Sequence, residues 1–186
     1  MEKNSIIKTY NISNTFLDEA EKIITGSNIN FIYDRKTSRG EITDPNVIDK
    51  GQIIHHLYYD HKPQSEHYDF FRTVFDETKI PVKQMLRMKI NVTFPLIGYR
   101  DHNHQMCHQD INNPEQRPDL RYKSLIVYIN KSDGDTMFFE DNKIVKKIKH
   151  ERGKGILFDS GLTHAGQNPM NNDSRIVLNT IFVSGD

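Results

Sequence analysis

The spacing of hydrophobic residues changes along the chain from a helical period to a strand period. Residues 14–26 carry one apolar stripe and a segment beginning near Ser65 carries another, which predicts two amphipathic helices. In the first helix we expect Thr15 and Asp18 to form a capping box and Gly26 to close the end. The two stripes consist of Phe16, Leu17, Ala20, Ile23 and Ile24, and of Tyr68, Phe71, Val74 and Phe75.

After these helices, apolar and polar residues alternate, which is the pattern of strands. In residues 84–94 this alternation places Arg87 and Asn91 on the same face. Two helices followed by about eight short strands predict an α+β, mainly β fold whose strands form a sandwich or jelly roll. The other predicted strands cover residues 5–12, 122–130, 135–141, 143–150, 155–159 and 175–183, with a turn at Asp141-Asn142 between the third and fourth of these ranges.

The stretch from Tyr33 to Asp60 is polar and irregular, and we interpret it as a long ordered loop or lid. Tyr58 and Tyr59 leave two interpretations open, because the segment could grip a substrate or be an ordinary insertion packed on the barrel. We expect most of the histidines in and near this stretch to be exposed loop residues. They are His55, His56, His61 and His67.

Composition narrows the class of protein. A length of 186 residues predicts one domain spanning 1–186. A net charge of +0 removes the simplest electrostatic case for nucleic acid or a membrane surface, so we expect neither as a partner. Cys107 is the only cysteine, and no signal peptide or membrane-spanning stretch is apparent. We therefore expect a cytoplasmic protein, in a bacterium or in the host if a virus encodes it.

The candidate chemistry centres on the sequence "MCHQD", where His108 and Asp110 lie two residues apart. On a strand both would project to the same side, with Cys107 turned toward the core. Two histidines and one carboxylate are a ligand set suited to Fe(II), and His164, on a later strand, would complete it. Arg175 begins the last predicted strand and could bind a carboxylate through two parallel hydrogen bonds, or could pair with Asp173 at the surface.

Two nearby histidines offer a competing ligand set. His102 and His104 have the H-x-H spacing of a cupin-like site, but the nearest glutamate, Glu115, lies beyond Asp110, so the fit is poor. We expect both to border the substrate entrance or to be solvated.

Three longer segments extend the pattern. His108-Gln109-Asp110, His164 and Arg175 resemble the HxD…H…R pattern of 2-oxoglutarate- and Fe(II)-dependent dioxygenases. The segments "IVYIN", "DGDTMFF" and "RGKGILFDSGLTHAG" resemble the prolyl 4-hydroxylase-like branch of that family, over roughly Thr15 to Val183. The chain departs from that pattern with Asp133 and Asp135 in the second segment and with Arg152 in place of a proline in the third.

The resemblance implies a double-stranded β-helix with N-terminal helices packed on one sheet. It implies that His108, Asp110 and His164 hold Fe(II), and that Arg175 and Tyr128 bind the distal carboxylate of 2-oxoglutarate. It further implies hydroxylation of a C–H bond with O2, with ascorbate as an accessory reductant. A prolyl residue or free proline is the first candidate among small-molecule or peptidyl substrates.

Strand alternation adds further pocket residues to this set. It places Asn179 on the same face as Arg175, near the co-substrate, and we expect Arg87 or Asn91 to line the pocket. Two alternatives stay open, namely a cupin-type metal enzyme that does not use 2-oxoglutarate and a non-catalytic jelly-roll binding module.

Overall fold

A computed structural model describes residues 7–36, 44–112, 117 and 119–185 of the chain. The helices are α1 (Asn14–Thr25), α2 (Tyr68–Arg72) and α3 (Val74–Thr78). The strands are β1 (Lys8–Asn11), β2 (Ile32–Asp34), β3 (Gln52–Tyr59), β4 (Lys62–Pro63), β5 (Val82–Thr93), β6 (Tyr122–Tyr128), β7 (Thr136–Glu140), β8 (Lys143–Ile148), β9 (Lys154–Asp159), β10 (His164–Gly166) and β11 (Arg175–Ser184).

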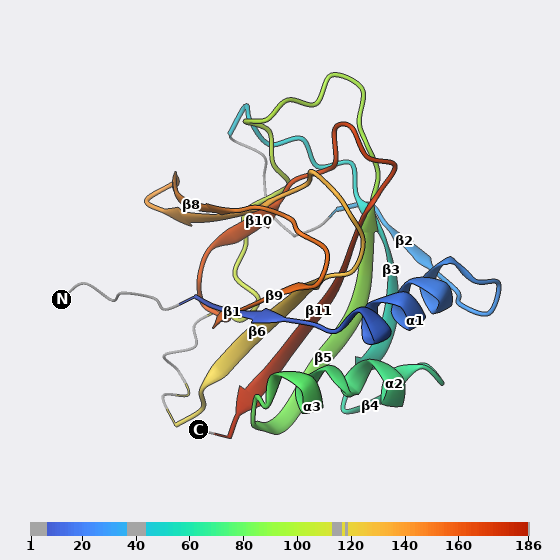
Figure 1. The fold of residues 1–186 in the computed structure, drawn as a ribbon. Helices are drawn as coiled ribbons and strands as arrows, with labels where there is room; N and C mark the ends of the chain where they lie inside the picture. The colour runs from blue at the N-terminus through green and yellow to red at the C-terminus, as the bar shows by residue number, and fades with distance from the viewer. Residues whose placement is uncertain (1–6, 37–43, 113–116, 118, 186) are drawn as a thin grey trace.

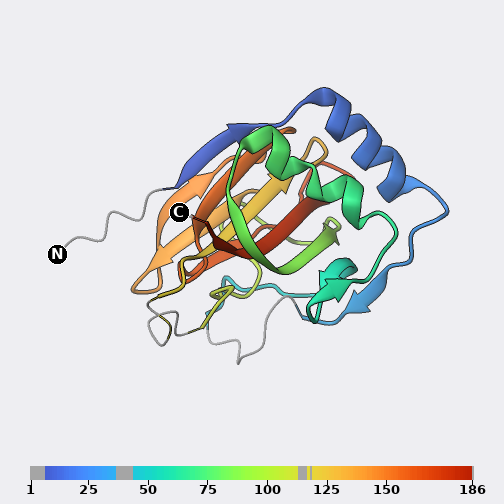
Figure 2. The same ribbon diagram turned by 90° about the horizontal axis from the view of Figure 1, so that it is seen from below.

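The strands form two antiparallel sheets (Figure 1). The large sheet has the order β1-β9-β6-β11-β5-β3-β2, with β4 added beside β3, and the small sheet has the order β10-β7-β8. The helices lie on the outer face of the large sheet, as the view from below in Figure 2 shows. The expected α+β, mainly β double-stranded β-helix with helices on one sheet is therefore confirmed. None of the helices in the described ranges has the length and apolar character needed to cross a membrane.

The alternation of β11 divides the interior into two cores. Ile176, Leu178 and Phe182 pack toward the helices, together with Phe16 and Leu17 of α1. Val177 faces the space between the two sheets, where it joins a smaller cluster that contains Ile126, Tyr128, Phe138, Ile148, Ile156 and Phe158. A strand buried on both faces explains why every residue of β11 is buried. Every second side chain of β11 therefore points into the space between the two sheets, where a site can form.

The first helix begins two residues earlier than it would with Thr15 as its N-cap. The Ser13 hydroxyl accepts the Phe16 backbone N–H at 3.1 Å and caps the helix. Glu77 of α3 accepts the Ser13 backbone N–H at 2.9 Å, which a local capping-box residue would otherwise do. Gly26 ends the helix in extended backbone with φ −76°. The predicted capping box of Thr15 and Asp18 is therefore wrong, because a distant carboxylate satisfies the helix end.

The predicted lid is also wrong over much of its length. Residues 52–59 form β3, which pairs with β5 in the large sheet. His55 and His56 are half-buried on this strand, so the expectation of exposed loop histidines fails for both. The strand escaped detection because a register shift between His56 and Tyr58 interrupts its alternation. Residues 37–43 of the predicted lid lie outside the described residues.

Candidate metal centre and adjoining pocket

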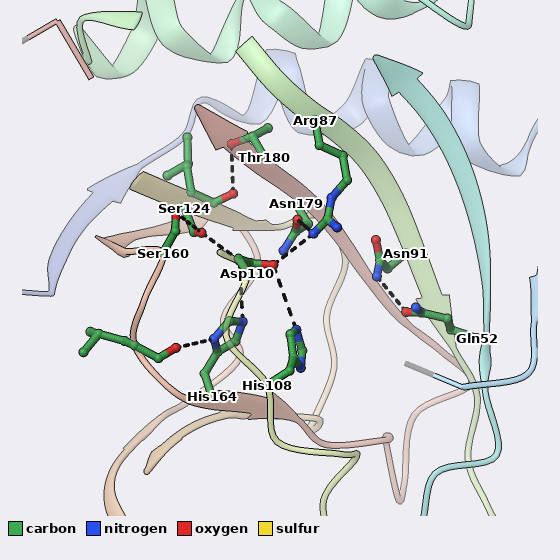
Figure 3. Close-up of polar contacts among 12 residues, drawn as sticks. Gln52, Arg87, Asn91, His108, Asp110, Ser124, Ser160, His164, Asn179 and Thr180 are labelled. Atoms are coloured by element: carbon green, nitrogen blue, oxygen red, sulfur yellow. Dashed lines mark hydrogen bonds and ion pairs between the residues drawn. The ribbon is translucent and has the colours of Figure 1, made fainter. Parts of the chain in front are cut away.

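Three candidate ligands meet between the two sheets (Figure 3). His108, Asp110 and His164 each offer one ligand atom, and these atoms lie within 4.8 Å of one another. Backbone hydrogen bonds of 2.9 Å in both directions pair His108 with His164. His108 therefore lies beside β10 as an isolated bridge rather than on a strand of its own. The predicted H-x-D strand end is wrong, although the two side chains still converge.

The spacing of the ligand atoms suits one ion. His108 Nε2 lies 3.9 Å from Asp110 Oδ1, and His164 Nε2 lies 3.7 Å from Asp110 Oδ2. Two ligand atoms held at about 2.2 Å from the same ion can be at most about 4.4 Å apart. Both distances fall within that limit.

The two imidazoles are oriented by backbone carbonyl groups. His108 Nδ1 lies 3.1 Å from the Met106 carbonyl oxygen, and His164 Nδ1 lies 2.9 Å from the Leu162 carbonyl oxygen. A carbonyl only accepts, so each Nδ1 carries a proton, and Nε2 is the ring nitrogen left to bind a metal. Burial, followed by the proximity of His164, lowers the pKa of His108 to about 4. His108 is therefore neutral near pH 7, as a metal ligand must be.

The Asp110 carboxylate is held on both oxygens. Arg87 Nη2 donates to Oδ1 at 2.9 Å, and the Ser124 hydroxyl donates to Oδ2 at 2.7 Å. Ser124 is itself 2.9 Å from the Ser160 hydroxyl. Burial opposes ionisation of Asp110, but His164, Arg87 and the other neighbours outweigh it and lower its pKa. The donor set of two imidazoles and one ionised carboxylate fits a divalent transition metal such as Fe(II).

Arg175 lies at one end of the adjoining pocket and is buried, with 5% of its surface exposed. Its Nε donates to the Gly134 carbonyl oxygen at 2.7 Å, and its Nη2 donates to the Thr136 hydroxyl at 3.1 Å. Arg175 is therefore not a surface arginine paired with Asp173, which was the alternative interpretation. These two bonds fix the guanidinium plane, which is the requirement for binding a carboxylate through two parallel hydrogen bonds.

Tyr128 stands beside Arg175 rather than on the pocket wall. Its hydroxyl donates to Thr136 Oγ1 at 2.8 Å, and its ring centre lies 6.0 Å from the Arg175 guanidinium carbon. Burial raises the pKa of Tyr128 to about 12, so the phenol stays protonated and can donate. Its expected contact with a co-substrate carboxylate stays a prediction, because its hydrogen bond goes to Thr136.

The polar face of β5 forms another wall of the pocket. Arg87, Lys89 and Asn91 line it, and so does Asn179 of β11, which lies in register with Lys89. Asn91 Nδ2 donates to Gln52 Oε1 of β3 at 2.6 Å (Figure 3). Both Asn179 and Asn91 therefore face the pocket, as alternation predicts, and their roles toward a ligand stay predictions.

Lys89 is a charged pocket residue that the motifs did not identify. It is buried, and burial together with the nearby Arg87 lowers its pKa to about 8. The alternation of residues 84–94 already places Lys89 on the face of Arg87 and Asn91, so the signal was present in the sequence. What the pattern could not show is that a lysine on this face would be buried.

The competing histidines do not join the site. His104 is buried, with Nδ1 2.8 Å from the Gln105 carbonyl oxygen and Nε2 3.6 Å from Asp44 Oδ2, so the prediction of an entrance or solvated position is wrong. His102 is exposed, in agreement with the solvated alternative. Cys107 is half-buried with its thiol 3.7 Å from His104 Nδ1, rather than packed in the apolar core. Burial raises its thiol pKa to about 11.

Comparisons with known proteins agree with this geometry. The model of the 2OG-Fe(II) oxygenase superfamily matches residues 54–183, which is more than half of the chain. A comparison of the sequence with curated proteins finds no match.

Solved structures with the same fold include three enzymes of low sequence identity. A prolyl-4-hydroxylase from Pseudomonas putida has a TM-score of 0.57 and 14% identity, covering 97% of this chain and 93% of that one. An oxidoreductase of the 2OG-Fe(II) oxygenase family from Burkholderia pseudomallei has a TM-score of 0.60 and 12% identity, covering 89% and 78%. The α-ketoglutarate-dependent carbocyclase SnoK of nogalamycin biosynthesis has a TM-score of 0.58 and 9% identity, covering 99% and 81%. At these identities the likeness concerns the fold alone.

Proposed function

Because this chain belongs to the 2OG-Fe(II) oxygenase superfamily, we propose that it hydroxylates a C–H bond at the site formed by His108, Asp110 and His164. Enzymes of this family use Fe(II), 2-oxoglutarate and O2. The observation that carries the proposal is the convergence of the three ligand atoms beside a buried arginine. Family membership favours this function over the two alternatives that the sequence leaves open.

In the proposed mechanism, the three ligands hold Fe(II) in an orientation set by their neighbours. The Met106 and Leu162 carbonyl groups keep Nε2 of each histidine directed at the metal position. Arg87 and Ser124 keep Asp110 ionised and fix the plane of its carboxylate. Iron bound here supplies the oxidising chemistry, in which one oxygen atom of O2 enters the substrate C–H bond and the other enters succinate as 2-oxoglutarate loses CO2.

Arg175 binds the distal carboxylate of 2-oxoglutarate in this proposal. Its guanidinium is already oriented by Gly134 and Thr136, so little conformational entropy is lost when the carboxylate binds. Tyr128 lies next to Thr136 and Arg175 and contributes to the binding of the same carboxylate. Asn179 and Asn91 complete the polar wall around the co-substrate. Ile126 and Val177 supply apolar surface that limits the access of water to the bound co-substrate.

A prolyl residue or free proline is the first candidate substrate. Support for it comes from the "YIN" and "DGDT" segments, which resemble the prolyl 4-hydroxylase-like branch. The structurally similar prolyl-4-hydroxylase of Pseudomonas putida shares the fold, and the similar SnoK is described as a carbocyclase, so the fold alone does not select the substrate.

Succinate formation tests the proposal without a known substrate. The purified protein is supplied with Fe(II), ascorbate, O2 and 2-oxoglutarate, and we expect slow succinate release. His164→Ala should abolish it by removing a metal ligand, and Arg175→Ala should raise the KM for 2-oxoglutarate strongly. His102→Ala is the matched control, since this exposed histidine lies outside the site. Metal binding without any 2-oxoglutarate turnover would favour the cupin-type enzyme instead.

A further inference from the structure

Lys89 is a buried cation whose charge the described residues leave unpaired. It lies in the middle of β5, and 9% of its surface is exposed. In register, Asn179 of β11 lies on one side and His56 of β3 on the other. Among residues 7–36, 44–112, 117 and 119–185, the side-chain ammonium has no hydrogen-bond or ion-pair partner. Burying an unpaired charge is costly, and a ligand of opposite charge bound in the pocket would offset that cost.

The pocket as a whole has an excess of positive charge. Its lining contains three side chains that are cationic at pH 7, Arg87, Lys89 and Arg175, and one carboxylate, Asp110. Asp110 is already paired with Arg87. Fe(II) and 2-oxoglutarate carry equal and opposite charges, so their binding would leave the excess in place. A further anion would neutralise the loaded pocket, and the substrate is the component of the reaction that can supply it.

Lys89 and Arg175 occupy different levels of the pocket. Arg175 is in register with Thr93 of β5, whereas Asn179 is in register with Lys89. The backbone positions of the two residues are therefore four residues apart along the sheet, or about 13 Å at 3.3 Å per residue. Arg175 donates a hydrogen bond to Thr136. Along β5, Lys89 lies between Arg87 and Thr93, the residue in register with Arg175. This separation assigns the two cations to two different anionic groups.

Unsatisfied polar atoms cluster around Lys89. Within the described residues, His56 Nδ1, Arg87 Nε and Asn91 Oδ1 are buried without a hydrogen-bond partner. The side chains of His56 and Arg87 can donate hydrogen bonds. His56 is in register with Lys89 on the neighbouring strand, and Arg87 lies two residues before Lys89 on β5. A carboxylate has two oxygens and about four acceptor positions, so it can satisfy an ammonium and a neighbouring donor together.

We propose that Lys89 binds a carboxylate of the substrate, and that the enzyme therefore acts on a free amino acid or another small carboxylic acid rather than on an interior residue of a peptide. This inference rests on the proposed function. It makes Lys89 a specificity-determining residue. For the first candidate substrate, it selects free proline over a prolyl residue within a chain.

Binding of matched acids and amides tests the inference. The protein is loaded with Zn(II) and 2-oxoglutarate and titrated calorimetrically with L-proline and L-prolinamide, then with the other free L-amino acids and their amides. At least one acid should bind, and its amide should bind at least about tenfold more weakly, because a charged hydrogen bond is lost. Lys89→Met should reduce binding of that acid by a similar factor, and Lys89→Arg should retain most of it.

Turnover provides the second readout. The acid that binds should stimulate 2-oxoglutarate consumption in the Fe(II) enzyme, and Lys89→Met should remove the stimulation. The substrate-free KM for 2-oxoglutarate should rise far less in this variant than in Arg175→Ala, since Arg175 holds the co-substrate. A thermal melt confirms that Lys89→Met is folded.

Four results would overturn the inference. They are equal binding of acid and amide, unchanged acid binding in Lys89→Met, a strongly raised KM for 2-oxoglutarate in that variant, and no binding of any acid by a protein that turns over 2-oxoglutarate. The absence of substrate-free turnover in the unmodified protein is a different result, because it overturns the proposed function itself.

Discussion

Arg87 Nη2 donates to Asp110 Oδ1 at 2.9 Å, so an arginine of the large sheet holds a candidate metal ligand that comes from a loop. The side chain of Asp110 is only 1% exposed, whereas that of Arg87 is 27% exposed. A buried carboxylate needs such a partner to stay ionised, and Arg87 supplies both the charge and the hydrogen bond. The strand that builds the wall of the pocket therefore also positions the metal site.

Replacement of Arg87 should weaken metal binding. In Arg87→Met the Asp110 carboxylate loses its cation and turns more freely, and we expect roughly 10- to 100-fold weaker Fe(II) binding. Anaerobic calorimetry with Fe(II) measures the change. Arg117→Met is the matched control, because the Arg117 side chain is 62% exposed and pairs with Asp119. Equal Fe(II) affinity in the two variants would show that Arg87 does not position Asp110.

The contact between Gly134 and Arg175 should control the affinity for 2-oxoglutarate. A Cβ at Gly134 would lie 2.7 Å from Arg175 Cδ and 2.6 Å from the Gln167 carbonyl oxygen. Gly134→Ala would therefore displace Arg175 and the backbone at Gln167, and we expect the KM for 2-oxoglutarate to rise about tenfold, equivalent to about 1.4 kcal/mol. Gly155→Ala serves as control, because its nearest neighbour would be 3.5 Å away. A KM that stays unchanged in Gly134→Ala would argue against Arg175 as the carboxylate-binding residue.

His150 should make the folded protein sensitive to acid. Its ring stacks on Tyr128 with centroids 4.2 Å apart, and burial followed by Arg175 lowers its pKa to about 3. An unfolded histidine binds a proton near pH 6.5, so between pH 6.5 and pH 3 the unfolded chain holds more protons and stability falls as the pH drops. The loss at pH 5 is roughly 2 kcal/mol.

Urea unfolding at pH 7 and pH 5 checks this prediction. His150→Gln cannot take up a proton in this range, so its free energy of unfolding should fall less between the two pH values than that of the unmodified protein. Identical pH dependence in the two proteins would mean that His150 does not contribute to the acid sensitivity.

Arg152 should fasten α1 to the loop before β9. It donates to Asp18 at 2.6 Å and to Glu21 at 3.1 Å, and its side chain is 20% exposed. Because both partners reach solvent, we expect Arg152→Ala to lower the free energy of unfolding by only about 1 kcal/mol. Chemical denaturation measures this, and activity per folded molecule should stay constant. A loss of activity without a loss of stability would place Arg152 in the site instead.

The fold is predicted best from the sequence where one face of a strand is apolar and the other is polar. Alternation in residues 84–94 and in the last strand correctly oriented Asn91 and Asn179, because the outer faces of these strands pack on the helices. It failed at β3, where the register shift after His56 hides the period. The carboxylate that completes the Ser13 cap could not be found locally, because it belongs to Glu77 of α3.

In the site, too, the sequence pattern identifies the residues, whereas their contacts with distant parts of the chain could not be predicted. Residue types and order identified His108, Asp110, His164 and Arg175 as a group. Their surroundings could not be predicted, since the Arg87–Asp110 pair joins residues of different elements and the buried position of His104 depends on its pairing with Val47. Likewise, alternation placed Lys89 on the pocket face but could not show that its charge is unpaired.

Anaerobic Fe(II) titration tests the central claim, the His108–Asp110–His164 centre, most directly. We predict one equivalent of Fe(II) bound by the unmodified protein and by His102→Ala, and at least about 100-fold weaker binding by His164→Ala, which lacks one of three ligands. Equal Fe(II) affinity in His164→Ala and the unmodified protein would contradict the account.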